Sequence, residues 1–160
     1  MPARLDAFCF IQKNVWIEDP PAYWGTIGKQ TLILSQDGET IESIDNYVQW
    51  EGHNSPWPTP PGGPWAMEYI KGHPRFGNCF KINSDRESDI FFHFAHISDG
   101  CFVLPKNLKE HTAEGEHFFK LCVDNRDGLV AYQNTIQDLR SDEDKVALPI
   151  NYDNMPKWID

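Results

Sequence analysis

Hydrophobic and polar residues alternate along much of the chain, which is the pattern of β-strands with one buried face. The run from Ile90 to His96 shows this most strongly. Between two such runs, Gln36-Asp37-Gly38-Glu39 predicts a hairpin, because Asp-Gly suits the tight turns that join antiparallel strands. We expect one or two strands over residues 7–11 and 14–17, further strands at 31–35, 40–44, 66–70, 79–82, 90–96 and 145–150, and a turn at 72–77.

Two segments in the last third of the chain are expected to be helical. Phe118, Leu121 and Cys122 recur at helical spacing, which predicts a helix at 114–123. A second helix is expected at 129–139. Short strands followed by one or two helices predict a β-rich α+β fold, and 160 residues suit a single domain spanning 1–160.

The stretch from residue 50 to 65 is rich in proline, glycine and tryptophan. Proline removes backbone donors and glycine favours turns, so we expect a loop here. Trp50, Trp57 and Trp65 would be poor residues for a solvated linker. We expect them to pack onto the domain or to line a groove.

The composition excludes several classes of partner. The chain has 14 Lys and Arg against 24 Asp and Glu, a formal net charge of -10. Such a charge repels phosphate backbones, which argues against nucleic acid, and it favours encounter with a basic protein. No apolar run approaches the roughly 20 residues that cross a bilayer, so we expect no membrane insertion.

The apolar stretch near the N-terminus is too short and interrupted for a signal peptide. Three explanations stay open: the protein remains in the cytoplasm, it is exported without such a signal, or the signal was removed.

Four cysteines occur, at Cys9, Cys79, Cys101 and Cys122. Their spacing matches no zinc ribbon, and four in a chain of this length do not make a disulfide scaffold. Free cysteines are often buried, so we expect one or two buried thiols. A bridge between Cys9 and Cys122 could form after export.

The candidate chemistry lies between Ile90 and Leu104. The more apolar strand face, which includes Phe92, is expected to point inward, and this leaves His93 on the opposite face. Gly100 lets the backbone turn tightly before Cys101 and bring amide N–H groups near its sulfur, as an oxyanion hole requires. A nearby imidazole lowers the pKa of a thiol and supplies the reactive thiolate. The residues therefore make Cys101 a candidate nucleophile and His93 its candidate base, and a buried cysteine beside a histidine in a strand and turn, which is common, is the alternative.

Four motifs in order make the chain resemble the L,D-transpeptidase (YkuD-like) superfamily, and its compact type VI secretion effector members most of all. A Pro/Gly turn at 59–65 leads into a strand with an aromatic residue, Tyr69. A Pro-basic-Phe-Gly turn is matched at 73–77 and an Ile-x-apolar-His strand at 90–93. Gly-Cys followed by apolar residues is matched at 100–104. The resemblance covers about residues 59–104 and implies a β-sandwich or barrel core.

The resemblance implies acyl transfer on bacterial peptidoglycan, without a metal or other cofactor. The thiolate of Cys101 would attack the carbonyl between meso-diaminopimelate and D-alanine of a tetrapeptide stem. D-alanine would leave with a proton from His93. The acyl-enzyme would then pass to water, as in an L,D-carboxypeptidase, or to a free D-amino acid in an exchange.

Further residues are candidates for holding the substrate. Arg75 or Arg86 could bind a substrate carboxylate, because guanidinium pairs well with carboxylates, although solvated surface positions are the alternative for both. Tyr69 and Trp65 could wall the groove or could pack in the core.

The chain departs from the commonest family pattern at Asp99, in the shorter interval from His93 to Cys101, and at Phe94, where glycine is usual. Asp99 stands where most members have a second histidine, in Ser-His-Gly-Cys. Asp99 could orient a histidine or could stabilise the turn. His96 lies three residues after His93, so the choice of which ring faces Cys101 stays open, with the strand pattern and the motif favouring His93.

The similarity to secreted effectors predicts a biological setting. We expect an antibacterial toxin that is secreted without a signal peptide and acts in the periplasm of a target cell. A toxin of that kind implies a cognate immunity protein that blocks the site.

Three other interpretations stay open. A zinc site could be formed by Cys101 together with His93, His96, His111 or His117, although the spacing is unfamiliar. A non-enzymatic module could stack tryptophans on sugars. A papain-like cysteine amidase is the third, but its cysteine normally precedes its histidine, whereas His93 precedes Cys101 here.

Overall fold

The computed structural model describes the backbone of residues 2–17, 23–51, 62–84, 90–95, 97–98, 102–105, 112–140 and 145–148. Side chains are described at 2–12, 28–45, 62–84, 90–94 and 113–140. The elements in chain order are β1 (Arg4–Ile17), β2 (Tyr23–Gln36), β3 (Glu39–Glu51), β4 (Gly62–His73), β5 (Gly77–Ile82), β6 (Ile90–Ala95), β7 (Ile97–Ser98), β8 (Phe102–Pro105), α1 (Thr112–Asp124), β9 (Val130–Asp138) and β10 (Lys145–Leu148).

The predicted β-rich α+β class is confirmed, and each predicted strand is present over the residues that are described. The two segments at 7–11 and 14–17 form one long strand, β1. The hairpin between β2 and β3 turns at Asp37 and Gly38, which both have positive φ, 53° and 81°. Such angles suit the tight hairpin turns that Asp-Gly favours. The helix expected at 114–123 is α1.

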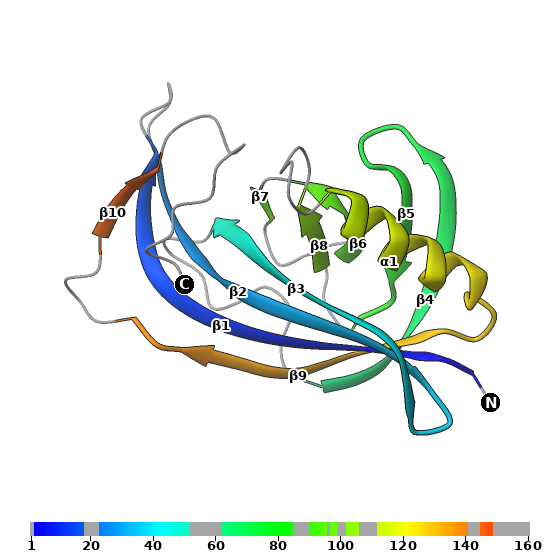
Figure 1. Ribbon diagram of the computed structural model, residues 1–160. Coiled ribbons are helices and arrows are strands. Elements are labelled where there is room, and N and C mark those ends of the chain that lie inside the picture. The colour runs from blue at the N-terminus through cyan, green and yellow to red at the C-terminus, as the bar shows by residue number, and fades with distance from the viewer. Residues whose placement is uncertain are drawn as a thin grey trace.

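The strands form one mixed sheet in the order β7-β3-β2-β1-β9-β4-β5-β6-β8, with β10 pairing in parallel with β1. β1, β2 and β3 are long antiparallel neighbours, and β9 lies parallel to β1. The register of β1 against β2 shifts between Ile11 and Lys13, and such bulges bend strands. Figure 1 shows that the long strands curve, so the sheet curls into a half-barrel.

Helix α1 packs on the concave side of this half-barrel, where it contacts β3 and β8 (Figure 1). Phe92 of β6 meets Phe118 and Phe119 of α1 edge-on, with ring centroids 6.5 and 5.4 Å apart. Phe80 of β5 lies 5.5 Å from Phe119 in the same geometry. Edge-to-face contacts of this kind add to the stabilisation from burying the rings. The long strands contribute Leu5, Ala7, Leu32, Leu34 and Ile44 to the same core, and Ala3, just before β1, joins them.

The prediction of a helix at 129–139 is wrong, because most of this segment forms strand β9. Ala131 and Gln133 are buried while their neighbours in the chain are at least partly exposed, which is a period of two. β9 lies between β1 and β4 and pairs Ala131 with Leu5 of β1. These two ladders satisfy the backbone of the segment, and this tertiary pairing outweighs its local helical pattern.

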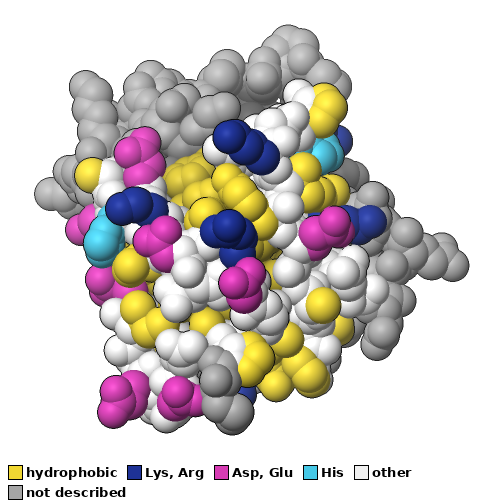
Figure 2. All heavy atoms as spheres, turned by 90° about the vertical axis from the view of Figure 1, so that its right-hand side faces the viewer, with side chains coloured by type: hydrophobic (Ala, Val, Ile, Leu, Met, Phe, Trp, Pro, Cys, Tyr) yellow, Lys and Arg dark blue, Asp and Glu magenta, His cyan; other side chains and the backbone are white. Residues whose placement is uncertain are grey.

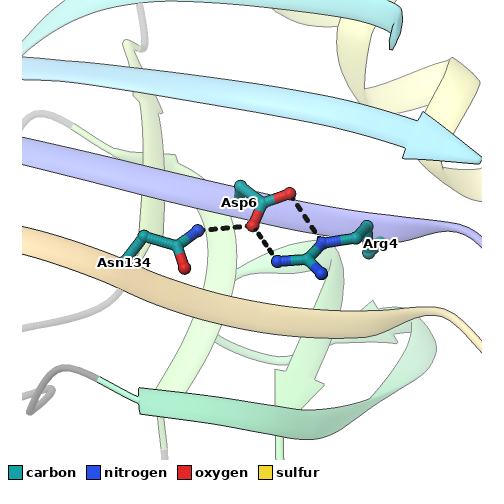
Figure 3. A network of polar contacts seen from close by, with 3 residues as sticks. All are labelled: Arg4, Asp6 and Asn134. Carbon is teal, nitrogen blue, oxygen red and sulfur yellow. Dashed lines mark hydrogen bonds and ion pairs between the residues drawn. The ribbon is translucent and has the colours of Figure 1, made fainter. Parts of the chain in front are cut away.

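A polar network ties β9 to β1 on the outer face of the sheet (Figure 3). The Nε of Arg4 donates to Oδ2 of Asp6 at 2.9 Å, and Nδ2 of Asn134 donates to Oδ1 of the same carboxylate. The hydrogen bond to Asp6 raises the pKa of Arg4. Asn134 occupies the bulge in β9, so the network fixes the position at which the register shifts.

The loop expected at 50–65 is strand at both ends, because β3 continues to Glu51 and β4 begins at Gly62. Residues 52–61 lie outside the described residues. In the part of the chain that is described, no helix is both long and apolar enough to cross a membrane.

Figure 2 shows the face that forms the right-hand side of Figure 1. Lysine and arginine side chains alternate with aspartate and glutamate around an apolar area. The net charge of -10 is therefore not gathered into one acidic patch on this face.

Candidate functional site

Strand β6 carries the one predicted catalytic residue whose side chain is described. Phe92 points into the core, which confirms the predicted inward face. His93 lies on the opposite face, yet it is only 3% exposed. A second layer of side chains must therefore cover this face of β6.

The neighbouring strand β5 supplies part of that layer. Phe80 pairs with Phe92 in the antiparallel register of β5 and β6. Because successive strand residues alternate, Cys79 shares the face of His93 rather than the core face. The side chain of Cys79 is fully buried there.

The turn between β4 and β5 supplies the rest of the layer. The ring of Phe76 lies 4.1 Å from the ring of His93, centroid to centroid, at an interplanar angle of 31°. Phe76 also stacks on His73 at 5.1 Å and meets Phe91 at 5.0 Å. Together with Arg75, these side chains form what we call the hairpin cluster: His73, Arg75, Phe76, Phe91 and His93.

Backbone hydrogen bonds fix the turn that carries the cluster. The Nδ1 of His73 accepts from the backbone N–H groups of Arg75 and Phe76, at 3.1 and 3.2 Å. The backbone N–H of Gly72 donates to Oδ1 of Asn78 at 3.0 Å. The turn therefore holds Phe76 in a defined place above β6.

A hydrogen bond to the backbone orients His93. Its Nδ1 lies 3.1 Å from the carbonyl oxygen of Phe94. A carbonyl oxygen only accepts, so Nδ1 carries the proton, and in the neutral ring Nε2 then holds the lone pair. The arrangement selects the tautomer whose Nε2 can accept a proton.

The surroundings of His93 disfavour its charged form. Burial is the largest cause that lowers the pKa of His93, and electrostatic interactions with Arg75 and His73 lower this pKa further. The hydrogen bond to the Phe94 carbonyl acts in the opposite direction. The net effect is a lowered pKa, so the ring is neutral over a wider range of pH than an exposed histidine.

The structure brings some of the predicted substrate residues close to His93 and not others. Arg75 is exposed at the tip of the hairpin, 5.3 Å from the ring centroid of Phe76. Tyr69 is half-buried on the core side of β4, where its ring lies 5.2 Å from that of Phe80. Trp65 is a member of the core.

The remaining predicted site residues, which are Arg86, His96, Asp99, Gly100 and Cys101, lie outside the described residues. β8 begins at the residue after Cys101 and runs parallel to β6. Its first residue, Phe102, is paired with Phe92.

The residues that cover His93 were not singled out from the sequence as functional. Phe76 was noted only as part of a turn motif, and Phe91 and Cys79 only as strand residues. The aromatic residue in the Pro-Arg-Phe-Gly turn could have indicated a ring that covers a neighbouring strand. Turns are ordinarily polar, and an aromatic ring in one needs a side chain to pack against.

The described residues contain no group of three histidine, cysteine, aspartate or glutamate side chains placed to hold a metal ion. His117 of α1 instead lies 3.5 Å from the carboxylate of Glu42, at the surface. Cys9 and Cys122 are separate thiols rather than a bridge, and burial raises the pKa of both, that of Cys9 to about 11.

Comparisons with known proteins add no relative to this description. No protein-family model, no curated protein and no solved structure matches the chain.

Proposed function

We propose that the chain is a cysteine-dependent acyl-transfer enzyme of the L,D-transpeptidase kind, acting on the tetrapeptide stems of peptidoglycan. Cys101 is the nucleophile and His93 is its base in this proposal. The observation that carries it is the hydrogen bond from His93 Nδ1 to the Phe94 carbonyl, because it leaves Nε2 ready to accept the proton of a thiol.

Burial also supports this role for His93. A general base must be neutral to work, and its lowered pKa keeps the ring neutral near physiological pH. A histidine with a perturbed pKa, a fixed tautomer and a charged neighbour is a candidate for catalysis on physical grounds.

Chain connectivity limits how far the two proposed groups can be from each other. Consecutive Cα atoms are about 3.8 Å apart, and Cys101 directly precedes Phe102. Phe102 is paired with Phe92, the residue before His93, and paired strands lie about 4.8 Å apart. The pairing of Phe102 with Phe92, each next in the chain to one of the two proposed residues, supports Cys101 and His93 as partners in the reaction.

The chemistry proceeds in two steps that share one intermediate. The Cys101 thiolate forms a bond to the carbonyl carbon that joins meso-diaminopimelate to D-alanine, and the C–N bond breaks as His93 returns its proton to the departing amine. Water or a free D-amino acid then attacks the thioester, with His93 again taking a proton. The thiolate is regenerated, and no oxidant or cofactor is consumed.

Arg75 is the described residue best placed to bind a carboxylate of the stem peptide. It is exposed, it projects from the turn above His93, and its charge acts on that ring. Guanidinium groups bind carboxylates through paired, charge-assisted hydrogen bonds. Arg86, His96 and Asp99 remain candidates for binding and orientation on the resemblance alone.

The resemblance further suggests a toxin that acts in the periplasm of a target bacterium after secretion without a signal peptide. Such a toxin would be neutralised in the producing cell by a cognate immunity protein bound over the site. This biological setting depends on the enzymatic proposal and is separate from the test that follows.

Purified tetrapeptide muropeptides, read by mass spectrometry with and without added D-amino acid, test the proposal. We expect loss of D-alanine, or its replacement by the added amino acid, with the wild-type protein. Cys101→Ala should abolish the change. Cys79→Ala is the matched control, because Cys79 is a buried cysteine on the face of the sheet that carries His93, and it should keep most of the activity.

Each alternative result has a definite meaning. Activity that survives Cys101→Ala but not Cys79→Ala would move the nucleophile to β5. No turnover by the wild-type protein, or equal turnover by both variants and the wild type, would remove the catalytic proposal.

A further inference from the structure

The ring of Phe76 occupies the space above His93 where water would otherwise lie. The two rings are 4.1 Å apart, which is van der Waals contact, and His93 is 3% exposed. Phe76 comes from the β4–β5 turn rather than from β6, so the cover over His93 is a separate structural unit from the strand that carries it.

We propose that Phe76 is a positioning residue for His93, which holds the imidazole in place and keeps water away from it. This inference rests on the acyl-transfer role proposed for His93 and explains how a histidine on the outer face of β6 is kept in one orientation. Phe76 acts through His93 and takes part in no chemical step of its own.

The contacts of Phe76 explain why its ring stays in place. His73 stacks on one side of it at an interplanar angle of 20°, and Phe91 packs against it at 48°. The backbone N–H of Phe76 itself also donates a hydrogen bond to Nδ1 of His73. A ring fixed by two neighbours and by its own backbone can restrain a third ring.

Among the described residues, the charged and titratable groups near His93 come from the β4–β5 hairpin. His73 ends β4 and Arg75 lies on the turn, and electrostatic interactions with both disfavour the imidazolium of His93. Cys79 and Lys81 of β5 share the face of β6 that carries His93, since Lys81 pairs with Phe91. Burial is nevertheless the largest cause of the lowered pKa, and Phe76 is the ring nearest to His93.

Removal of the ring should therefore have two consequences. Water would reach the imidazole and stabilise its charged form, so the pKa of His93 should rise. The ring of His93 would also gain freedom to leave the Phe94 carbonyl, which should lower kcat more than it changes KM.

The test follows the ring protons of His93 by NMR across a pH series, without any substrate. We expect His93 in Phe76→Ala to titrate at higher pH than in the wild type. Phe76→Tyr, which keeps the ring, should titrate like the wild type. Tyr69→Leu removes a half-buried ring of the same hairpin that faces Phe80 instead, and it should leave the titration of His93 unchanged.

An unmoved titration in Phe76→Ala would overturn the assignment, and so would an equal shift in Tyr69→Leu. If Phe76→Ala does not fold, Phe76→Leu keeps apolar volume without the flat ring and should show a smaller shift in the same direction. No shift there would also overturn the assignment.

The titration separates this inference from the acyl-transfer proposal. An inactive wild type with the expected shift would defeat the enzyme alone. An active wild type with an unmoved titration would defeat the role of Phe76 alone. Where both hold, the acidic limb of kcat/KM should move to higher pH in Phe76→Ala together with the pKa of His93.

Discussion

The imidazole of His93 donates from Nδ1 to the carbonyl oxygen of Phe94, the next residue along the same strand, at 3.1 Å. The bond fixes both the tautomer and the plane of the ring. It therefore allows the structural role of His93 to be tested apart from its proposed chemical role.

His93→Asn should separate these two roles. The asparagine amide nitrogen stands near the position of Nδ1 and can donate to the Phe94 carbonyl, but asparagine is no base. We expect turnover of muropeptides to fall by about 10²- to 10⁴-fold, which is the usual contribution of a general base. The free energy of unfolding should change by less than about 1 kcal/mol, because the hydrogen bond is kept.

His93→Ala provides the comparison, because it removes the donor and leaves a cavity under Phe76. We expect a loss of about 1–3 kcal/mol in urea unfolding from the unsatisfied buried carbonyl and the lost contacts. Wild-type turnover in His93→Asn would rule out His93 as the base and would favour His96.

The lowered pKa of His93 also predicts how stability depends on pH. An unfolded histidine titrates near pH 6.5, whereas the folded His93 titrates lower. Between these two values the unfolded chain binds a proton that the folded chain does not, so the free energy of unfolding falls as the pH drops below about 6.5. Above that pH the contribution is fully present.

Urea unfolding at pH 7.5 and pH 5.0 measures this effect, with His93→Asn as the reference protein. The wild type should lose more stability than the variant over this interval, because the variant lacks the titrating group. Equal losses in the two proteins would show that other groups carry the pH dependence.

The local signals in the sequence predicted most of the elements and failed at β9. Asp37-Gly38 and the alternation on either side defined the β2–β3 hairpin, since both depend only on nearby residues. The segment at 129–139 presents Ala131 and Gln133 inward, and neither is strongly apolar, so its period of two was hard to see. Its strand conformation depends on pairing with β1, more than 120 residues earlier in the chain.

The candidate site shows the same division between local and long-range information. Alternation along β6 was enough to predict that His93 faces away from the core. The cover of Phe76 over His93 depends on how the β4–β5 turn folds back over β6, which no local pattern describes. For the same reason the sequence did not indicate that Cys79 would share the face of His93.

Gly28 is predicted to be intolerant of any side chain. A Cβ atom at this position would lie 2.2 Å from the carbonyl oxygen of Phe10 and 2.9 Å from the Cα of Ile11. Both are backbone atoms of β1, next to the bulge that bends the strand, so they cannot move aside without breaking the ladder. We expect Gly28→Ala to cost roughly 1–3 kcal/mol or more, as overpacking does.

Ser43→Ala is a suitable control for Gly28→Ala, because Ser43 is exposed on the neighbouring strand β3. Its cost in urea or thermal unfolding should stay within about 0.5 kcal/mol. A Gly28→Ala protein as stable as this control would mean that β1 and β2 are further apart at the bulge than the structure has them.

The reactivity of the four cysteines tests the proposed nucleophile without any substrate. Burial raises the pKa of Cys9 to about 11 and raises that of Cys122 as well, so both are almost entirely protonated at neutral pH. Cys79 is buried under the hairpin. Because the thiolate is the reactive form, these three should label slowly in the folded protein.

We therefore expect brief treatment with iodoacetamide at pH 7.5 to add one carbamidomethyl group, located at Cys101 by peptide mapping. A Cys101→Ser protein should take up none over the same time, and both proteins should label fully at every cysteine in guanidinium chloride. Rapid labelling of Cys79 in the native protein would place a reactive thiol beside His93 on β5. That result would transfer the role of nucleophile to Cys79, because His93 would then activate the thiol of Cys79 on β5 rather than that of Cys101.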